Sequence, residues 1–97
     1  MVVKWNKSAI RDLHKIYLYI AEYSSYYAKK VTIDILNASE NLAKFPKQGK
    51  LVPGVTKADT REILVYSYRM IYRVHQRNVR ILLLVHSRQD FQTTQKL

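Results

Sequence analysis

The sequence predicts an α+β fold, in which a short N-terminal strand and an antiparallel helical hairpin pack on one face of a small antiparallel sheet. In the N-terminal half, apolar residues recur at steps of three and four, which indicates helices. In the C-terminal half they alternate with other residues, which indicates strands, and every proline and glycine falls between the two halves. A chain of 97 residues suits one core, so a single domain is expected over residues 1–97.

The N-terminal half is expected to form one strand and two helices. Residues 2–5, VVKW, suit a short opening strand. A first amphipathic helix continues to about Tyr23, and Ser24 interrupts the pattern and can cap a second helix. Pro46 ends the second helix. Because the break between the helices is short, an antiparallel helical hairpin is expected over about residues 8–45.

The C-terminal half is expected to form a three-stranded meander. Residues 46–60 are a connection that holds every proline and glycine of the chain. The meander follows over residues 61–86, with a tight hairpin between its first two strands and a turn at Asn78 before the third. A C-terminal tail covers residues 87–97.

Alternation divides the side chains of the meander between two faces. The apolar set is expected against the helices: Ile63, Val65, Tyr68, Met70, Tyr72, Val74, Val79, Ile81, Leu83 and Val85. The opposite set mixes cations with apolar residues: Glu62, Leu64, Tyr66, Arg69, Ile71, Arg73, Arg80, Leu82, Leu84, His86 and Arg88. Such a mixture predicts an open binding surface with Arg69 outside the core. The alternative is structural, with Arg69 and Arg73 paired to Glu62 and a C-terminal carboxylate.

The charge of the chain points to an anionic partner. Seventeen Lys and Arg residues stand against seven Asp and Glu residues, which gives a formal net charge of +10. Nucleic acid and an acidic protein segment both fit such a charge. Six of the seven arginines fall within residues 61–88, whereas nine of the ten lysines precede residue 58. Because the arginine fork pairs with carboxylate or phosphate, the C-terminal half is predicted to be the binding half.

Several classes of protein are excluded or disfavoured. The chain has no cysteine, its three histidines lack metal-like spacing and it has no nucleotide fingerprint, so neither a metal nor another cofactor is expected. No apolar run reaches the length of a membrane span, so no membrane association and a cytoplasmic location are expected. His86 beside Arg88 would suit acid–base chemistry and phosphate stabilisation in RNA cleavage, although a structural histidine is the commoner alternative.

Three motifs in this order resemble the RelE/ParE superfamily of bacterial toxins, and most of all its ParE, or plasmid-stabilisation, branch. They are the P-x-x-G-x-x-V-P loop at 46–53, the Y-R-x-x-Y-R-V strand at 68–74 and the V-H-x-R-x-D end at 85–90. The resemblance extends over about residues 2–91. It implies the toxin component of a type II toxin–antitoxin system, which a cognate acidic antitoxin wraps and neutralises.

The two branches of the superfamily differ in target. ParE-like members inhibit DNA gyrase without nuclease chemistry, whereas RelE-like members cleave mRNA on the ribosome. By the resemblance, Arg69 and Arg88 match arginines that hold phosphate in RelE-like nucleases. Glu62 and Leu64 stand where such a nuclease places lysines, and the tyrosine expected after Arg88 is missing. This depleted set favours the ParE branch; if the chain is a nuclease, its catalytic residues are Arg69, His86 and Arg88.

Antitoxin or target binding is assigned to eight residues: Arg69, Arg73, Arg80, His86, Arg88, Gln89, Asp90 and Phe91. Arg69 and Arg88 are expected to pair with antitoxin carboxylates. The expected partners are an acidic antitoxin and DNA gyrase, or the ribosome and mRNA on the alternative interpretation. Two further hypotheses stay open: a module that keeps its antitoxin but has lost toxicity, and a general nucleic-acid binder with a steep salt dependence.

Overall fold

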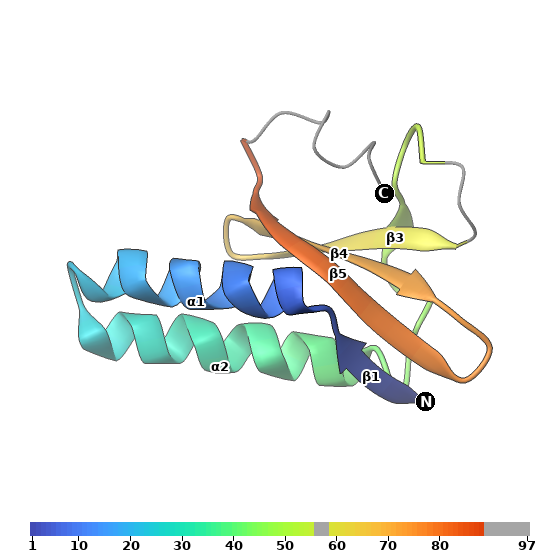
Figure 1. The fold of residues 1–97 in the computed structure, drawn as a ribbon, viewed down its shortest axis with the longest axis horizontal. Helices are drawn as coiled ribbons and strands as arrows, with labels where there is room; N and C mark the ends of the chain where they lie inside the picture. Colours follow the sequence, from blue (N-terminus) through green and yellow to red (C-terminus); the bar gives the residue numbers. More distant parts are fainter. Residues whose placement is uncertain (56–58, 89–97) are drawn as a thin grey trace.

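The computed structural model describes residues 1–55 and 59–88, and it has two layers, a helical hairpin and a five-stranded sheet (Figure 1). The elements follow in the order β1 (Val2–Trp5), α1 (Lys7–Ala21), α2 (Ser25–Asn41), β2 (Lys50–Leu51), β3 (Thr60–Val65), β4 (Tyr68–Val74) and β5 (Asn78–His86). In the contacts between the layers, α1 packs on β5 and α2 on β3. The predicted α+β class is confirmed.

The helices of the hairpin end slightly earlier than predicted, α1 at Ala21 and α2 at Asn41. Ser24 caps α2 as expected, because its Oγ accepts a hydrogen bond from the N–H of Tyr27 at 3.1 Å. After α2, the amides of residues 42–44 bond three residues back rather than four, which tightens the chain into a turn.

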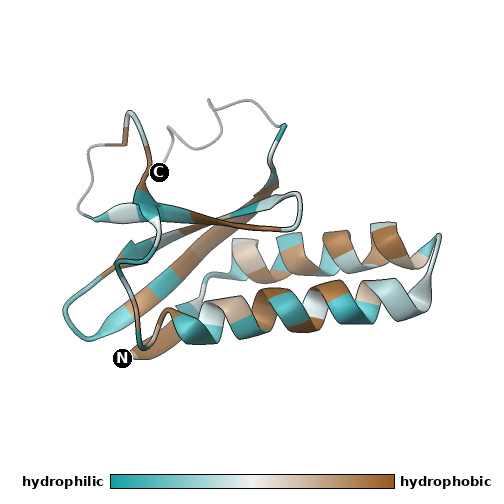
Figure 2. Ribbon diagram, turned by 180° about the vertical axis from the view of Figure 1, so that it is seen from behind, coloured by the Kyte–Doolittle hydropathy of each residue, from teal (hydrophilic) through white to brown (hydrophobic). Residues whose placement is uncertain are grey.

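Both helices carry hydrophilic as well as hydrophobic residues along their length (Figure 2). The hydrophobic residues of α2 that are fully or nearly buried are Ala28, Val31 and Ile35. These side chains belong to the core between the helices and the sheet, as the stripe of apolar residues predicts. Within the part of the chain that the structure describes, no helix is both long and apolar enough to cross a membrane.

The sheet is mixed, which corrects the predicted antiparallel arrangement. Its strand order is β1-β5-β4-β3-β2, and β1 pairs in parallel with β5 while every other pair is antiparallel. The sequence predicted residues 2–5 as a strand but carried no signal for a partner more than seventy residues away. The two-residue strand β2, within the connection 46–60, was not predicted.

A β-bulge changes which residues at the end of β5 face the helices. The register between β4 and β5 shifts by one residue and leaves Leu82 as the extra residue of β5. Beyond the bulge, Leu84 joins the core on the helix side, whereas Leu83 packs on the opposite face. By the same shift, Val85 pairs with Arg69 and faces away from the helices, whereas His86 pairs with Tyr68 on the helix side. Strict alternation predicted the reverse for these residues, because a one-residue slip exchanges the two faces.

The second face of the sheet, opposite the helices, is not the open surface that the sequence predicted. Ile71 and Leu82 are buried there against Val52, with Val55 of the same loop packed beside them. Burying each aliphatic side chain stabilises the fold by about 1.5–3 kcal/mol. The apolar residues on this face therefore form a second, smaller core under the loop.

Hydrogen bonds from β3 and β4 hold this loop in place. The hydroxyl of Tyr72 accepts from the N–H of Gly49 at 2.9 Å and donates to the carbonyl of Pro46 at 2.8 Å. Arg61 Nη1 donates to the carbonyl of Gly49 at 2.8 Å. A Cβ at Gly49 would lie 2.6 Å from the Tyr72 hydroxyl and from the carbonyl oxygen of Glu62, so only glycine fits here.

Candidate functional site

Arg69 is buried on the second face, which corrects the expectation of an exposed cation. Its Nε donates to Glu62 Oε2 at 3.2 Å, and its Nη2 makes a closer contact with the same oxygen. The two residues are only 7% and 8% exposed. Lys50 Nζ lies 3.7 Å from the other Glu62 oxygen. For Arg69, the structural alternative, an ion pair with Glu62, is thus confirmed.

His86 lies on the helix side of the sheet because of the bulge. It pairs with Tyr68 across β4 and β5, and the two rings meet edge to face with centroids 5.7 Å apart. His86 Nδ1 accepts a hydrogen bond from the backbone N–H of Arg88 at 3.2 Å. In the neutral imidazole this contact assigns the proton to Nε2, because Nδ1 is the acceptor.

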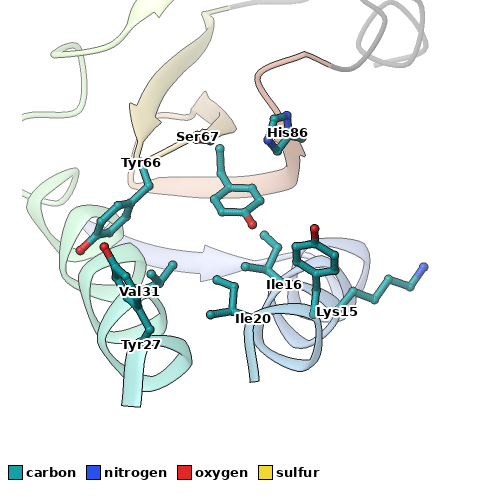
Figure 3. Close-up of a pocket in the computed structure, with 10 residues that line it drawn as sticks. Lys15, Ile16, Ile20, Tyr27, Val31, Tyr66, Ser67 and His86 are labelled. Carbon is teal, nitrogen blue, oxygen red and sulfur yellow. The ribbon is translucent and has the colours of Figure 1, made fainter. Parts of the chain in front are cut away.

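A pocket of about 460 Å³ opens beside His86, between the helical hairpin and the β3–β4 turn (Figure 3). Its apolar lining comes from Ile16, Ile20 and Val31, and further lining residues are Lys15, Tyr19, Tyr27, Tyr66, Ser67 and Tyr68. We call it the tyrosine pocket. This pocket was not predicted from the sequence.

Two tyrosines of the tyrosine pocket keep their protons well above neutral pH. A hydrogen bond from the Tyr66 hydroxyl to the Asp34 carboxylate raises the pKa of Tyr66 to about 12. Burial raises the pKa of Tyr68. Tyr66 adopts φ 55° in the two-residue turn between β3 and β4, where its bond to α2 helps to hold an unusual backbone conformation. Near neutral pH, these phenol side chains therefore stay uncharged beside an apolar lining.

Arg73 and Arg80 lie directly opposite each other at the other end of the sheet. Arg73 Nε donates to Thr60 Oγ1 at 3.0 Å, and Arg80 Nη1 donates to Asn6 Oδ1 at 3.0 Å. These two acceptors are neutral, so both contacts orient a guanidinium group without cancelling its charge. Five residues of β5 lie between Arg80 and His86, a distance of about 20 Å along the strand.

The residues of the hypothetical nuclease set do not converge. Arg69 pairs with Val85 and His86 with Tyr68, so the side chains of Arg69 and His86 leave opposite faces of the sheet. Arg88 is exposed after the end of β5. Gln89, Asp90 and Phe91 lie outside the described residues. Within residues 1–55 and 59–88, no group of three metal-ligating side chains is close enough to hold a metal ion.

The sequence did contain a signal for the tyrosine pocket. Four tyrosines surround the break between the helices and are at least half exposed: Tyr19, Tyr23, Tyr26 and Tyr27. Aromatic residues that cluster at a helix break and lie outside the core-facing stripe of their helices indicate a surface with apolar character. Their alignment with the β3–β4 turn could not be predicted, because it depends on how the hairpin lies on the sheet.

Comparison with known proteins identifies the family. The family model for the ParE toxin of the type II toxin–antitoxin system parDE matches residues 3–91. Among solved structures, the chain is similar to the chromosomal ParDE toxin–antitoxin system of P. aeruginosa, with 26% identity and a TM-score of 0.71 over 89% of this chain and 95% of that one. It shares its fold with the RelBE2 toxin–antitoxin complex of Mycobacterium tuberculosis, at 24% identity and a TM-score of 0.66 over 88% and 95% of the two chains. No curated protein sequence matched.

Proposed function

Because the chain belongs to the ParE toxin family of type II toxin–antitoxin systems, we propose that it inhibits DNA gyrase, and with it replication, without cleaving RNA. The observation that supports the absence of RNA cleavage is the separation of Arg69 from His86 by the sheet. The choice of gyrase follows from the resemblance to the ParE branch.

RNA cleavage by side chains requires an acid or base and a stabilising cation at the same phosphate. His86 faces the helices and the tyrosine pocket, whereas Arg69 faces the loop side. The guanidinium of Arg69 is also engaged by the buried carboxylate of Glu62, which neutralises it. An arginine in this state is a poor ligand for a phosphate group.

The alternative function is a ribosome-dependent mRNA endonuclease, and one observation favours it. His86 is exposed, and the amide of Arg88 donates to its Nδ1. A hydrogen bond of this kind selects one tautomer of the ring, which a histidine acting as general acid or base needs. In this alternative, Arg88 rather than Arg69 is the cation closest to the histidine in sequence.

We propose that a cognate acidic antitoxin binds at the end of the molecule that contains the tyrosine pocket, His86 and Arg88. The pocket offers an apolar lining, and Lys15 lines it as well. An antitoxin segment with a large apolar side chain next to a carboxylate complements this combination. The similar P. aeruginosa structure is itself a toxin–antitoxin system, which supports such a partner. The toxin and its antitoxin would meet in the cytoplasm, where gyrase is found.

The test is to induce the protein without its antitoxin in a bacterium and to follow DNA and protein synthesis separately by pulse labelling. On the gyrase proposal, DNA synthesis falls first, and purified protein inhibits supercoiling by purified gyrase. Co-expression with the antitoxin is the control, because it should restore DNA synthesis.

Two results would contradict the proposal. If protein synthesis stops first and transcripts are cleaved, the chain is an mRNA endonuclease, and His86→Gln should then abolish cleavage. If induction changes neither synthesis, the chain is a binding module that has lost toxicity.

A further inference from the structure

Three cations form a row across adjacent strands on the second face of the sheet. Lys4 of β1 lies directly opposite Arg80 of β5, and Arg80 lies directly opposite Arg73 of β4. The flanking residues of each strand, such as Val3, belong to the helix-side core, so the three cations point to the other face. Adjacent strands are about 4.8 Å apart, and the row therefore spans about 10 Å. We call these three residues the cation row.

At two of the three positions of the cation row, no carboxylate of the described residues balances the charge. No ion pair formed within residues 1–55 and 59–88 involves Lys4 or Arg80. Asn6, the hydrogen-bond partner of Arg80, is neutral. Like charges directly opposite each other on paired strands destabilise a sheet. An anion bound across the row would relieve this repulsion.

The surroundings of the row are hydrophilic and basic. The β4–β5 turn next to it is coloured hydrophilic in Figure 2. A shallow depression of about 400 Å³ at this turn is lined by His75, Gln76, Arg77, Asn78 and Arg80. None of these lining residues is Phe, Tyr or Trp, whereas the exposed tyrosines of the helical hairpin lie around its helix break. The depression thus offers charge, with the imidazole of His75 as the ring among its lining residues.

We propose that the cation row binds the phosphate backbone of duplex DNA. Each strand of duplex DNA presents one negative charge per about 3.4 Å of the helix axis, so about three phosphates of one strand lie within reach of a row of about 10 Å. Arginine forks that are held in place by side-chain acceptors suit phosphate oxygens. The site contacts no base edge in this proposal, so it binds without sequence preference. This proposed DNA binding is separate from inhibition of gyrase and does not depend on gyrase being the target.

Two other polyanions fit the row less well. Single-stranded nucleic acid is usually held by aromatic stacking in addition to charge, and the depression beside the row is lined by no Phe, Tyr or Trp. An acidic helix offers carboxylates about 5–6 Å apart along one face, which brings fewer charges to the row than a duplex does. Both remain as outcomes that the experiment separates from duplex binding.

The experiment measures binding of the full chain to a labelled duplex of about 20 base pairs by fluorescence anisotropy, between about 50 and 200 mM salt. Each phosphate contact contributes about 0.9 to the slope of log affinity against log salt. Lys4→Gln or Arg80→Gln should therefore lower that slope by about 0.9 and weaken binding about eightfold at about 0.1 M salt. The double variant should lower the slope by about 1.8.

The matched control is the double variant Arg11→Gln/Lys29→Gln, which removes one exposed arginine from α1 and one exposed lysine from α2 and changes the net charge equally. It should leave the slope unchanged. An equal loss in this control would overturn the proposal, because binding would then follow net charge alone. Arg80→Lys keeps the charge and should keep the slope. If Arg80→Gln fails to fold by circular dichroism, Lys4→Gln alone still decides, since Lys4 is exposed.

Two competitors complete the test. If a single DNA strand of the same length binds more tightly than the duplex, and substitutions in the cation row lower the affinity for that strand, the site is one for single strands and the proposal is wrong. If the row variants lose affinity for poly-glutamate but not for the duplex, the row binds an acidic polypeptide instead. The proposal stands if the duplex alone shows the loss of slope.

Discussion

Arg69 and Arg80 lie on the same face of the sheet, on neighbouring strands, yet their surroundings give them different roles. Under the loop that covers the second face, Arg69 is buried against the carboxylate of Glu62. Near the β4–β5 turn, which we call the turn end, Arg80 is partly exposed and is held by the neutral amide of Asn6. A carboxylate partner cancels the charge of an arginine, whereas an amide partner only orients it. The partner, and not the residue type, therefore separates a structural arginine from one that can bind an anion.

The same contrast separates the other contacts that hold the loop from the cation row. A second ion pair, in which Arg61 Nε lies 2.6 Å from Asp59 Oδ1, and the Tyr72 hydroxyl also hold the loop, from strand positions next to Arg73. The turn end contains Lys4, which has no ion-pair partner among residues 1–55 and 59–88. We therefore expect substitutions in the contacts that hold the loop to change stability, and substitutions in the cation row to change binding.

The largest effect on stability is expected from Arg69→Met. This change leaves Glu62 buried without its main partner, which should lower the free energy of unfolding by about 3–5 kcal/mol. The double variant Glu62→Leu/Arg69→Met should recover most of the loss, because it removes both charges. Urea denaturation of the two variants measures this difference, and a loss below about 1 kcal/mol in the single variant would show that the pair is not structural.

An intermediate effect is expected from Tyr72→Phe. Removal of the hydroxyl leaves the buried N–H of Gly49 and the carbonyl of Pro46 without their partner, which should lower the free energy of unfolding by about 1–3 kcal/mol. The control is Tyr19→Phe, since Tyr19 is 61% exposed and should change stability by less than about 0.5 kcal/mol. Equal stability of both variants in urea would mean that the loop is held by its apolar residues alone.

The smallest effect on stability is expected from Arg80→Gln. The lost hydrogen bond to Asn6 is partly exposed, and removal of one cation from the cation row reduces repulsion. The free energy of unfolding should therefore change by less than about 1 kcal/mol, in contrast to Arg69→Met. Thermal or urea denaturation can compare the two, and a large destabilisation by Arg80→Gln would make the turn end as structural as the contacts that hold the loop.

Much of the fold could be predicted from the sequence. The two helices, the cap at Ser24 and the strands of the meander all follow from local periodicity and from turn residues, and the structure confirms them. The parallel pairing of β1 with β5 could not be predicted, because no local pattern specifies a partner so distant in the chain. The bulge at Leu82 was missed because alternation assumes an uninterrupted register.

The candidate site could be predicted only in part. The sequence singled out Arg69, Arg80 and His86 as one group, since strict alternation placed them on one face. The bulge moves His86 to the helix side, and the loop covers the middle of the second face. The cation row needed Lys4, which joins the arginines only through the parallel pairing of β1.

By itself, the sequence determined the order and type of the elements, the excess of positive charge and the motifs of the toxin family. Each of these depends on residues that are close together in the chain or on simple sums over it. Only the tertiary structure decided which arginines are neutralised and which keep their charge. The physical reason is that a charge is cancelled by a neighbour in space, and neighbours such as Asn6 and Arg80 meet only when the sheet is complete.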